Sequence, residues 1–341
     1  MRVPMVKKPT VISTFAGCGG SSFGYKLAGF KELLAVEYDD NAVQTFKLNF
    51  PGIPVYHGDI AKLTGSECMK LAGIKKGQLD VFDGSPPCQG FSTAGKRKWD
   101  DPRNSLFKEY SRLINELQPK VFVMENVTGM VKGVMKQAYL LIIKTLRECG
   151  YDAKGEVMNA MYYNVPQARQ RVIIIGVRND LEIKSSHPKP QTKPISVRQA
   201  LSGVNNLKWE LDWTNHIKNS IIYPRICKMK PGDNYSDFSP NGSGFTLTRN
   251  WLNKSSSTIT KTVNHSASSD GTLHPIENRK HTISEIKRLS SFPDDFKLIG
   301  DFKEQWARIG NSVPPNLMKA IAEHIKINIL NYGKKENQTA A

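Results

Sequence analysis

The sequence predicts an α/β protein whose larger part is organised around one central sheet. Two observations support this prediction. Short apolar runs alternate with segments of helical period along residues 1–184, and most of these runs end in glycine, acidic or proline-rich turns. This alternation is typical of βαβ units, in which consecutive strands share one carboxyl edge. We therefore expect a Rossmann-like sheet with functional residues at its strand ends.

The first apolar run begins at Thr10 and leads into Phe-Ala-Gly-Cys-Gly-Gly at residues 15–20. A helix is predicted from about Ser21 to Ala28. Glycines at this place allow a sharp turn and a close approach of the backbone to a ligand. The dinucleotide fingerprint Gly-x-Gly-x-x-Gly is only approximated, so the turn fits a nucleoside cofactor better than a pyrophosphate.

Two further strand ends carry acids. Glu37 ends the run 33–37, about 20 residues past the glycines, where an acid commonly holds a ribose diol. Tyr38 could cover an adenine face, and Asp59, in the segment 55–60, could bind the adenine amino group. Simple packing and a solvated turn are the respective alternatives. Together the three strand ends predict a pocket for S-adenosylmethionine.

A cysteine follows another apolar run, residues 78–82. The segment that starts at Asp83 reads Asp-Gly-Ser-Pro-Pro-Cys-Gln-Gly-Phe-Ser. Pro86 and Pro87 restrict the backbone, so Cys88 is expected on a stiff support at the end of a strand. A basic, glycine-bounded run that we interpret as a mobile loop comes next. Cys88 is a candidate nucleophile, and a small buried apolar side chain is the alternative.

The apolar run 121–124 is flanked by two segments of helical period, 105–117 and 139–149, which we expect to pack on the core. The run ends at Glu125. Because ligands of open α/β sheets bind outside the carboxyl ends of the strands, Glu125 is expected in the same cleft as Cys88.

Gln167, Arg169 and Arg171 alternate where the next apolar run begins. Period-two spacing predicts that all three lie on one face of a strand. Arginines in such a place are often solvated, but the run that follows is apolar enough to be buried. We therefore expect them to have structural partners in the cleft.

The chain divides by composition into four parts. Residues 1–184 are predicted to form a catalytic and cofactor-binding domain, and a proline-rich stretch marks its end. Residues 185–278 are rich in Asn, Ser, Thr and Gly, show little periodicity, and are interpreted as an irregular β-rich domain. Residues 279–308 are expected to link the two domains, and residues 309–341 to return to the first.

Two local signals occur in the last third. Thr282 and Glu285 form a capping-box pattern that predicts the start of a short helix. Further on, Asn311 and Ser312 stand in Ile-Gly-Asn-Ser-Val-Pro-Pro, before an amphipathic helix predicted over 317–329.

Composition narrows the classes of function. Lysine and arginine exceed aspartate and glutamate, so the net charge is +17, which favours a nucleic-acid partner. The five cysteines include no Cys-x-x-Cys pair, which argues against a zinc ribbon or a disulfide framework. No apolar stretch is typical of a signal peptide or membrane span. We expect a cytoplasmic monomer that binds no metal ion and does not associate with a membrane.

These segments, in this order, resemble the DNA (cytosine-5)-methyltransferases of the bacterial or phage restriction-modification type. The resemblance runs from Phe15 to Pro315 and rests on Phe-Ala-Gly, Pro-Pro-Cys-Gln, Glu-Asn-Val, Gln-x-Arg-x-Arg and Gly-Asn-Ser-Val-Pro. Ser13 stands where many members have Asp, and Ser85 where Gly or Ala is usual. The resemblance implies a Rossmann-like S-adenosylmethionine-dependent methyltransferase domain with a smaller target-recognition domain at 185–278.

The resemblance also implies a reaction on double-stranded DNA, with S-adenosylhomocysteine as a product and a restriction endonuclease as companion if the cell carries one. Cys88 would add to carbon 6 of a flipped cytosine. Glu125 would bind ring nitrogen 3 and the amino group, Arg171 the base carbonyl, and Arg169 would orient Glu125. The implied cofactor residues are Phe15, Ala16, Gly17, Cys18, Gly19, Gly20, Glu37, Tyr38, Asp59, Ile60, Pro86, Leu106, Asn311 and Ser312.

The basic loop after Cys88 contains the side chains that we predict to contact DNA phosphates. They are Lys96, Arg97, Lys98 and Arg103.

Two alternatives stay open at this point. The same chemistry on tRNA is the first, although the RNA-modifying branch resembles a Cys-Phe-Thr signature in the variable region, and here Cys227 is followed by Lys228. A non-catalytic DNA-binding relative is the second, and the intact Cys88, Glu125 and Arg171 speak against it.

Overall fold

The computed structural model describes residues 8–87, 105–239, 247–264 and 271–331. The chain folds into two compact units. The first consists of Met1–Met158, Gln170–Lys189 and Met318–Ala341, and the second of Asn159–Arg169 and Pro190–Leu317. The roles assigned to residues 1–184, 185–278, 279–308 and 309–341 remain predictions.

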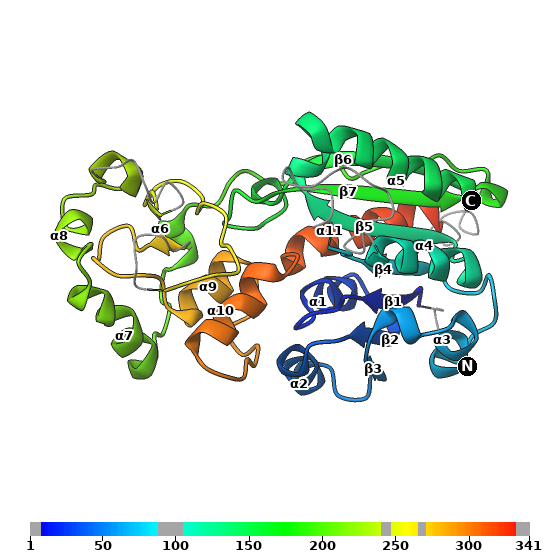
Figure 1. Cartoon of the computed structure of the whole chain (residues 1–341), viewed down its shortest axis with the longest axis horizontal. Helices are drawn as coiled ribbons and strands as arrows, with labels where there is room; N and C mark the ends of the chain where they lie inside the picture. Colours follow the sequence, from blue (N-terminus) through cyan, green and yellow to red (C-terminus); the bar gives the residue numbers. More distant parts are fainter. Residues whose placement is uncertain (1–7, 88–104, 240–246, 265–270, 332–341) are drawn as a thin grey trace, which may run out of the picture. The chain divides into compact units, whose positions relative to one another are not determined.

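The first unit contains a seven-stranded sheet in the order β3-β2-β1-β4-β5-β7-β6 (Figure 1). Neighbouring strands from β3 through β5 run parallel, whereas β7 runs antiparallel to β5. The α/β prediction is confirmed. The strands are β1 (Thr10–Thr14), β2 (Lys31–Glu37), β3 (Val55–His57), β4 (Val81–Gly84), β5 (Val121–Val127), β6 (Tyr151–Asn159) and β7 (Gln170–Arg178).

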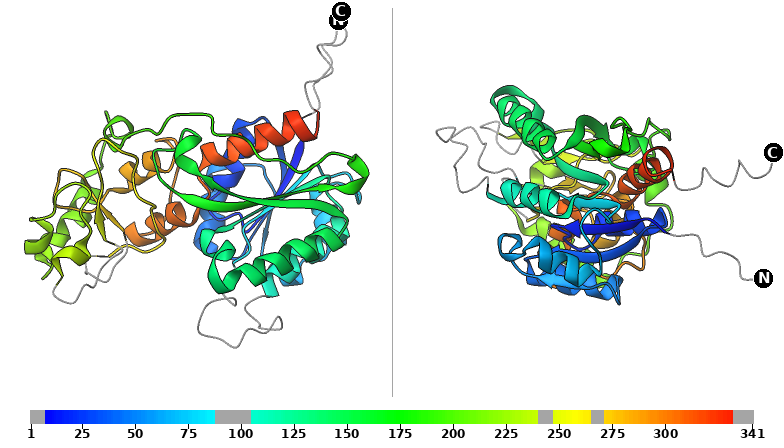
Figure 2. Two further views of the ribbon diagram at one scale, coloured as in Figure 1. Left: turned by 90° about the horizontal axis from the view of Figure 1, so that it is seen from above. Right: turned by 90° about the vertical axis from the view of Figure 1, so that its right-hand side faces the viewer.

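Helices cover both faces of this sheet, and Figure 2 shows α5 and α11 on opposite sides of it. The α-helices of this unit are α1 (Gly20–Leu27), α2 (Asp40–Asn49), α3 (Gly65–Ala72), α4 (Ser105–Leu117), α5 (Lys136–Glu148) and α11 (Pro315–His324), which begins in the second unit. Short turns of helix are η1 (Ile60–Lys62), η4 (Thr128–Val131), η5 (Gly133–Met135), η6 (Ala160–Tyr162, second unit), η7 (Asn179–Leu181) and the π-helix η10 (Ile325–Ile329).

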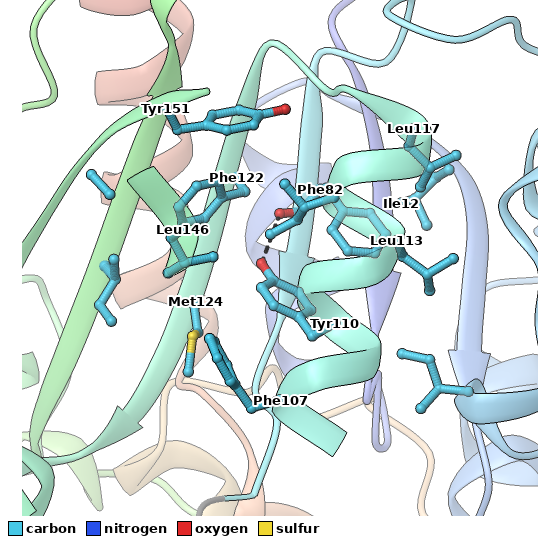
Figure 3. Close-up of a cluster of buried hydrophobic side chains, with 14 of the residues drawn as sticks. Ile12, Phe82, Phe107, Tyr110, Leu113, Leu117, Phe122, Met124, Leu146 and Tyr151 are labelled. Atoms are coloured by element: carbon cyan, nitrogen blue, oxygen red, sulfur yellow. Dashed lines mark hydrogen bonds between the residues drawn. The ribbon is translucent and has the colours of Figure 1, made fainter. Parts of the chain in front are cut away.

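The apolar face of α4 packs on the middle of the sheet (Figure 3). The rings of Tyr110 and Phe82 stack with centroids 5.2 Å apart, and the Tyr110 hydroxyl donates to the Val123 carbonyl at 2.9 Å. A buried tyrosine with a satisfied hydroxyl contributes area without leaving a polar group unpaired. This packing fixes β4 and β5 side by side, so their carboxyl ends emerge together.

The secondary structure of the second unit differs from the β-rich domain that we expected for residues 185–278. Among its described residues, β8 (Thr248–Arg249) and β9 (Thr272–Leu273) span two residues each. Its helical elements are α6 (Val197–Ala200), α7 (Lys208–Asn215), η8 (His216–Asn219), α8 (Tyr223–Ile226), η9 (Tyr235–Phe238), α9 (Ile283–Leu289) and α10 (Phe302–Asn311).

The β-rich prediction is therefore wrong for the described residues. Polar sequence without periodicity does not distinguish short helical turns from short strands, and here the tertiary contacts decide. Ile217, Ile226 and Tyr235 from three such turns pack with Leu247 and Leu273 into one small core.

The capping box at the start of α9 is confirmed. The Thr282 side chain accepts from the Glu285 amide, and the Glu285 carboxylate accepts from the Thr282 amide. Glu285 also accepts hydrogen bonds from Arg279, at 2.7 Å, and from His281, at 2.9 Å. Burial alone raises the pKa of Glu285, but these two partners outweigh it and hold the pKa well below its usual range. Glu285 thus connects the first turn of α9 to the side chains of Arg279 and His281, which precede the helix.

In the part of the chain that the structure describes, no helix has the length and apolar character needed to cross a membrane. Over the same residues, no group of three or more His, Cys, Asp or Glu side chains is placed to hold a metal ion.

Candidate active site

The turn after β1 is shaped by left-handed backbone. Phe15, Gly17 and Gly19 have φ of 53°, 56° and 98°. A Cβ at Gly19 would lie 2.2 Å from the Phe50 ring, so a larger residue there would collide as well as strain the backbone. Cys18 is fully buried beneath the turn, and α1 begins directly after it. The first amides of α1 therefore face the carboxyl edge of the sheet, where an anionic group can be bound.

Glu37, at the end of β2, closes this turn from the side. One carboxylate oxygen accepts from the Gly17 amide at 2.7 Å, and the other accepts from the Tyr38 and Asp39 amides at 2.7 and 2.9 Å. Three backbone donors orient the group, and the oxygen that accepts from Gly17 keeps lone-pair capacity for a ligand hydroxyl. Tyr38 beside it is 75% exposed, so its ring is accessible to a ligand.

Asp59 follows β3 and caps η1, where its carboxylate accepts from the Ala61 amide at 2.9 Å. Ile60 is buried behind it. The structure thus supports both interpretations of Asp59, since a capping carboxylate retains a second oxygen for a ligand amino group.

The segment after β4 carries the predicted nucleophile. Ser85, Pro86 and Pro87 are described, whereas Cys88 and the predicted phosphate-binding residues Lys96, Arg97, Lys98 and Arg103 lie outside the described residues. Leu106, in the first turn of α4, is half-buried and packs against the core.

Asn126 anchors this segment, a role that the sequence analysis missed. Its side-chain amide donates to the Pro86 carbonyl at 3.0 Å across the parallel strands β4 and β5. The only sequence signal was its position inside Glu-Asn-Val. A hydrogen bond to a backbone carbonyl requires no particular residue type at the acceptor position, so the sequence does not indicate the partner. Asn126 holds the residue two positions before Cys88.

Glu125 and Arg171 form an ion pair at the ends of β5 and β7. The Arg171 Nε lies 2.9 Å from a Glu125 carboxylate oxygen. The side chain of Arg171 is only 14% exposed and that of Glu125 only 11%. The antiparallel register pairs Arg171 with Val127 and Glu125 with Ile173, so the two side chains are diagonal neighbours. The structure thus brings together two of the residues predicted to act on the base.

Gln167 and Arg169 differ from the prediction. β7 begins at Gln170, so these two precede the strand, and they belong to the second unit. The Arg169 guanidinium donates to the carbonyls of Ile259 and Gly310 at 2.9 and 3.0 Å, and Gln167 donates to the Ser290 hydroxyl at 2.9 Å.

The expectation that Gln167, Arg169 and Arg171 share a strand face is therefore wrong. Alternation in sequence implies one face only where the backbone is a continuous strand.

Asn311 and Ser312 also lie in the second unit, at the end of α10. Asn311 is exposed, and the Ser312 hydroxyl donates to the Arg308 carbonyl at 2.7 Å.

A buried polar layer lies between the sheet and α1. Asp83 of β4 is 4% exposed, and hydroxyls of Ser21 and Tyr25 hydrogen-bond its carboxyl group. Burial is the main reason that the pKa of Asp83 rises to about 8 and that of Glu32 on β2 to about 7. The Ser22 hydroxyl donates to Glu32 at 2.9 Å. Neither acid belongs to the predicted site.

The strand order, the glycine turn after β1 and the acid at the end of β2 define a Rossmann-like α/β enzyme with its site at the carboxyl edge of the sheet. The sequence profile of the C-5 cytosine-specific DNA methylases matches residues 9–327. The chain belongs to this family and is a DNA (cytosine-5)-methyltransferase.

Named relatives agree with this assignment. The type II methyltransferase M1.HphI of Haemophilus parahaemolyticus is 34% identical over 93% of this chain and 86% of its own length. M.NgoPII of Neisseria gonorrhoeae is 34% identical over 93% of this chain and 95% of its own. A putative DNA modification methyltransferase from an Escherichia coli prophage has a similar structure, with a TM-score of 0.75 and 26% identity over 95% of this chain and all of its own.

The Dnmt2 structure of Spodoptera frugiperda superposes with a TM-score of 0.69 over 94% of this chain and 99% of its own, at 21% identity. At that identity the likeness shows the shared fold.

Proposed function

We propose that the protein methylates carbon 5 of a cytosine within a specific duplex DNA site, by transient addition of the Cys88 thiolate to carbon 6 of a flipped base. The Glu125–Arg171 ion pair is the observation that carries this proposal. It places one hydrogen-bonding acid and one cation beside the strand end from which Cys88 follows, where they can bind one polar edge of a cytosine.

Cytosine carbon 5 is too weak a nucleophile to accept a methyl group directly. Addition of a thiolate at carbon 6 breaks the 5,6 double bond and makes carbon 5 electron-rich. An ordinary cysteine has a pKa of about 8.5, so lowering that value in the closed site would favour the reaction. After methylation, loss of the carbon 5 proton and departure of the sulfur restore the ring and the free cysteine.

Glu125 and Arg171 act on the ring during this addition. Glu125, once it carries a proton, donates to ring nitrogen 3 and accepts from the exocyclic amino group, which draws electron density from the ring as sulfur adds. Arg171 binds the base carbonyl and holds Glu125 in position through their 2.9 Å contact. Asn126 positions the Cys88 segment by binding the Pro86 carbonyl. The role of orienting Glu125 stays a proposal for Arg169, whose guanidinium donates to the carbonyls of Ile259 and Gly310.

The residues of the first unit fit S-adenosylmethionine. The glycine turn leaves room for a nucleoside where side chains would obstruct it, and Glu37 presents an oriented carboxylate suited to a ribose diol. Asp59 and Ile60 would bind the adenine, and Tyr38 would cover it. When bound, the cofactor supplies an electrophilic methyl group. Asn311 and Ser312 remain proposed contacts from the second unit.

The DNA part of the proposal rests on charge and on the chemistry. A base inside a duplex cannot expose its ring faces to a thiolate, so the cytosine must leave the stack, at a cost of a few kcal/mol. Phosphate contacts from Lys96, Arg97, Lys98 and Arg103 would offset this cost.

We assign target recognition to residues 185–278. Since the named relatives are type II methyltransferases, a cognate restriction endonuclease is the proposed companion. A monomer in the cytoplasm is the proposed state of the enzyme.

The test is incubation with methyl-labelled S-adenosylmethionine and, separately, unmethylated genomic DNA and unmodified tRNA, with Cys88→Ser as the control. Label recovered as 5-methylcytosine in DNA and lost in the variant supports the proposal. Label confined to tRNA would move the substrate to RNA, and labelling of DNA by Cys88→Ser would contradict the covalent step.

A further inference from the structure

Two carboxyl groups that hydrogen-bond α1, those of Asp83 and Glu32, serve no role in the proposed chemistry, and that of Asp83 lies beside the glycine turn. Asp83 is on β4, and the parallel register places it next to Ser13 of β1. Its hydrogen bonds come from Ser21 and Tyr25, in the first two turns of α1. The Asp83 carboxyl group therefore adjoins the helix that begins at Gly20.

Burial of the Asp83 carboxyl group carries a cost in free energy. Among the described residues, no lysine, arginine or histidine forms an ion pair with Asp83, although its side chain is almost wholly buried. The titratable groups that face it are Tyr25 of α1, Glu32 of β2, Tyr110 of α4 and Glu125 of β5, all neutral or anionic. An isolated buried carboxyl group of this kind stays protonated, and the pKa of Asp83 is raised to about 8.

The methionine end of S-adenosylmethionine has complementary charge, with a sulfonium, an α-ammonium and a carboxylate. Backbone amides at the start of α1 suit the carboxylate. Glu37 is held by three backbone amides at the far end of β2, and Asp59 caps η1. Of the two acids that contact α1, Asp83 lies nearer the carboxyl edge, because it pairs with Ser13 whereas Glu32 pairs with Val11, so Asp83 is the one beside the turn.

We propose that Asp83 is a cofactor-binding residue whose carboxylate pairs with the α-ammonium group of S-adenosylmethionine, and that it loses its proton when the cofactor binds. This inference rests on the proposed cofactor. Ser13 stands where many family members have an aspartate, and its neighbour across the β1–β4 pair is Asp83. In this chain the carboxyl group thus stands on the neighbouring strand.

At pH 7 a carboxyl group with a pKa of about 8 is mostly protonated. The ammonium group of the ligand remains protonated, so the proton from Asp83 leaves to solvent and an ion pair forms. Binding should release protons in the wild type and release fewer in Asp83→Asn, whose amide has the same shape and no charge.

The decisive experiment compares two ligands by calorimetry at pH 7, S-adenosylhomocysteine and its analogue that lacks the α-amino group. Each is measured in two buffers of different ionisation enthalpy, so that affinity and proton release are obtained together. Asp83→Asn should reduce the preference for the amino ligand by roughly 10- to 100-fold, as loss of a charge-assisted hydrogen bond predicts. Glu32→Gln is the matched control, because it neutralises the other buried acid and should retain the wild-type preference.

Two outcomes would overturn the inference. Equal preference in the wild type and Asp83→Asn means that the acid only packs α1 against the sheet. Equal proton release with both ligands in the wild type leads to the same conclusion even if Asp83→Asn fails to fold. Adding Ser13→Asp to Asp83→Asn should restore part of the preference. A wild type that binds neither ligand would instead contradict the proposed cofactor itself, so the two failures are distinct.

Discussion

The Glu125–Arg171 pair provides the sharpest test of the proposed mechanism. Removal of Arg171 should reduce the methyl-transfer rate, and it should do so largely through Glu125. The contact is a direct charged hydrogen bond of 2.9 Å, and the side chains of Arg171 and Glu125 are 14% and 11% exposed. An exposed pair would contribute less than about 1 kcal/mol, whereas a shielded charge-assisted bond contributes about 1.5–3 kcal/mol.

The measurement is a double-mutant cycle on kcat/KM for methyl transfer to DNA, with Arg171→Ala, Glu125→Gln and the double variant. The loss in the double variant should be smaller than the sum of the single losses by about 2–3 kcal/mol, which is roughly 30- to 150-fold in rate. Two groups that act as one unit give such a deficit.

Lys120 and Asp80 supply a matched control in the same sheet. Their ion pair has a similar length, 2.8 Å, but both residues directly precede strands, at the edge remote from the site. Lys120→Met should lower the free energy of unfolding and leave kcat/KM within about twofold of the wild type. Additive losses for Glu125 and Arg171, within about 0.5 kcal/mol, would refute their joint action.

Three further substitutions have definite expectations. Asn126→Ala removes the hydrogen bond to Pro86 and should lower kcat by about 10- to 100-fold through misplacement of the nucleophile segment, measured in single-turnover methyl transfer. Gly19→Ala adds strain at φ 98° and a contact of 2.2 Å with Phe50, and should weaken S-adenosylhomocysteine binding at least about tenfold in calorimetry. Glu285→Gln should lower the free energy of unfolding in urea by about 3–5 kcal/mol at pH 7, because the buried Arg279 guanidinium loses its buried carboxylate partner.

Controls separate these effects from general damage. Gly52→Ala has a comparable φ of 88° with no atom within 4 Å of the added Cβ, so it should retain cofactor affinity while it loses some stability. For Asn126→Ala, an unfolding free energy that falls as much as the rate would point to a structural role alone.

Acid titration gives an independent check on Glu285. Its pKa is lowered in the folded state from an unfolded value of 4.5, so its stabilisation is fully present above about pH 5 and declines as the pH falls below that value. The difference in unfolding free energy between the wild type and Glu285→Gln should therefore decrease as the pH is lowered below about 5. A difference in unfolding free energy that does not change with pH would contradict the lowered pKa.

Local sequence determined the elements of the first unit. Helical and strand periods predicted β1 to β5, β7 and the helices α1, α4, α5 and α11, because each period records which face is buried, whereas β6, α2 and α3 were not predicted. The glycines after β1 and the acid after β2 were recognisable since backbone conformation and strand ends restrict which residues fit. The capping box of α9 could be predicted from the sequence because Thr282 and Glu285 lie within one turn.

Only the tertiary structure decided which distant residues meet. The bond from Asn126 to Pro86, the pairing of Glu125 with Arg171 and the adjacency of Ser13 and Asp83 all depend on strand order and register, which local sequence does not encode. The second unit shows the same limit, because its short turns are stabilised by a shared core rather than by their own periodicity. The order of the motifs can be seen in the sequence. The burial and the hydrogen-bond partners of the charged side chains, which decide their protonation and reactivity, are established only when the strands assemble into the sheet.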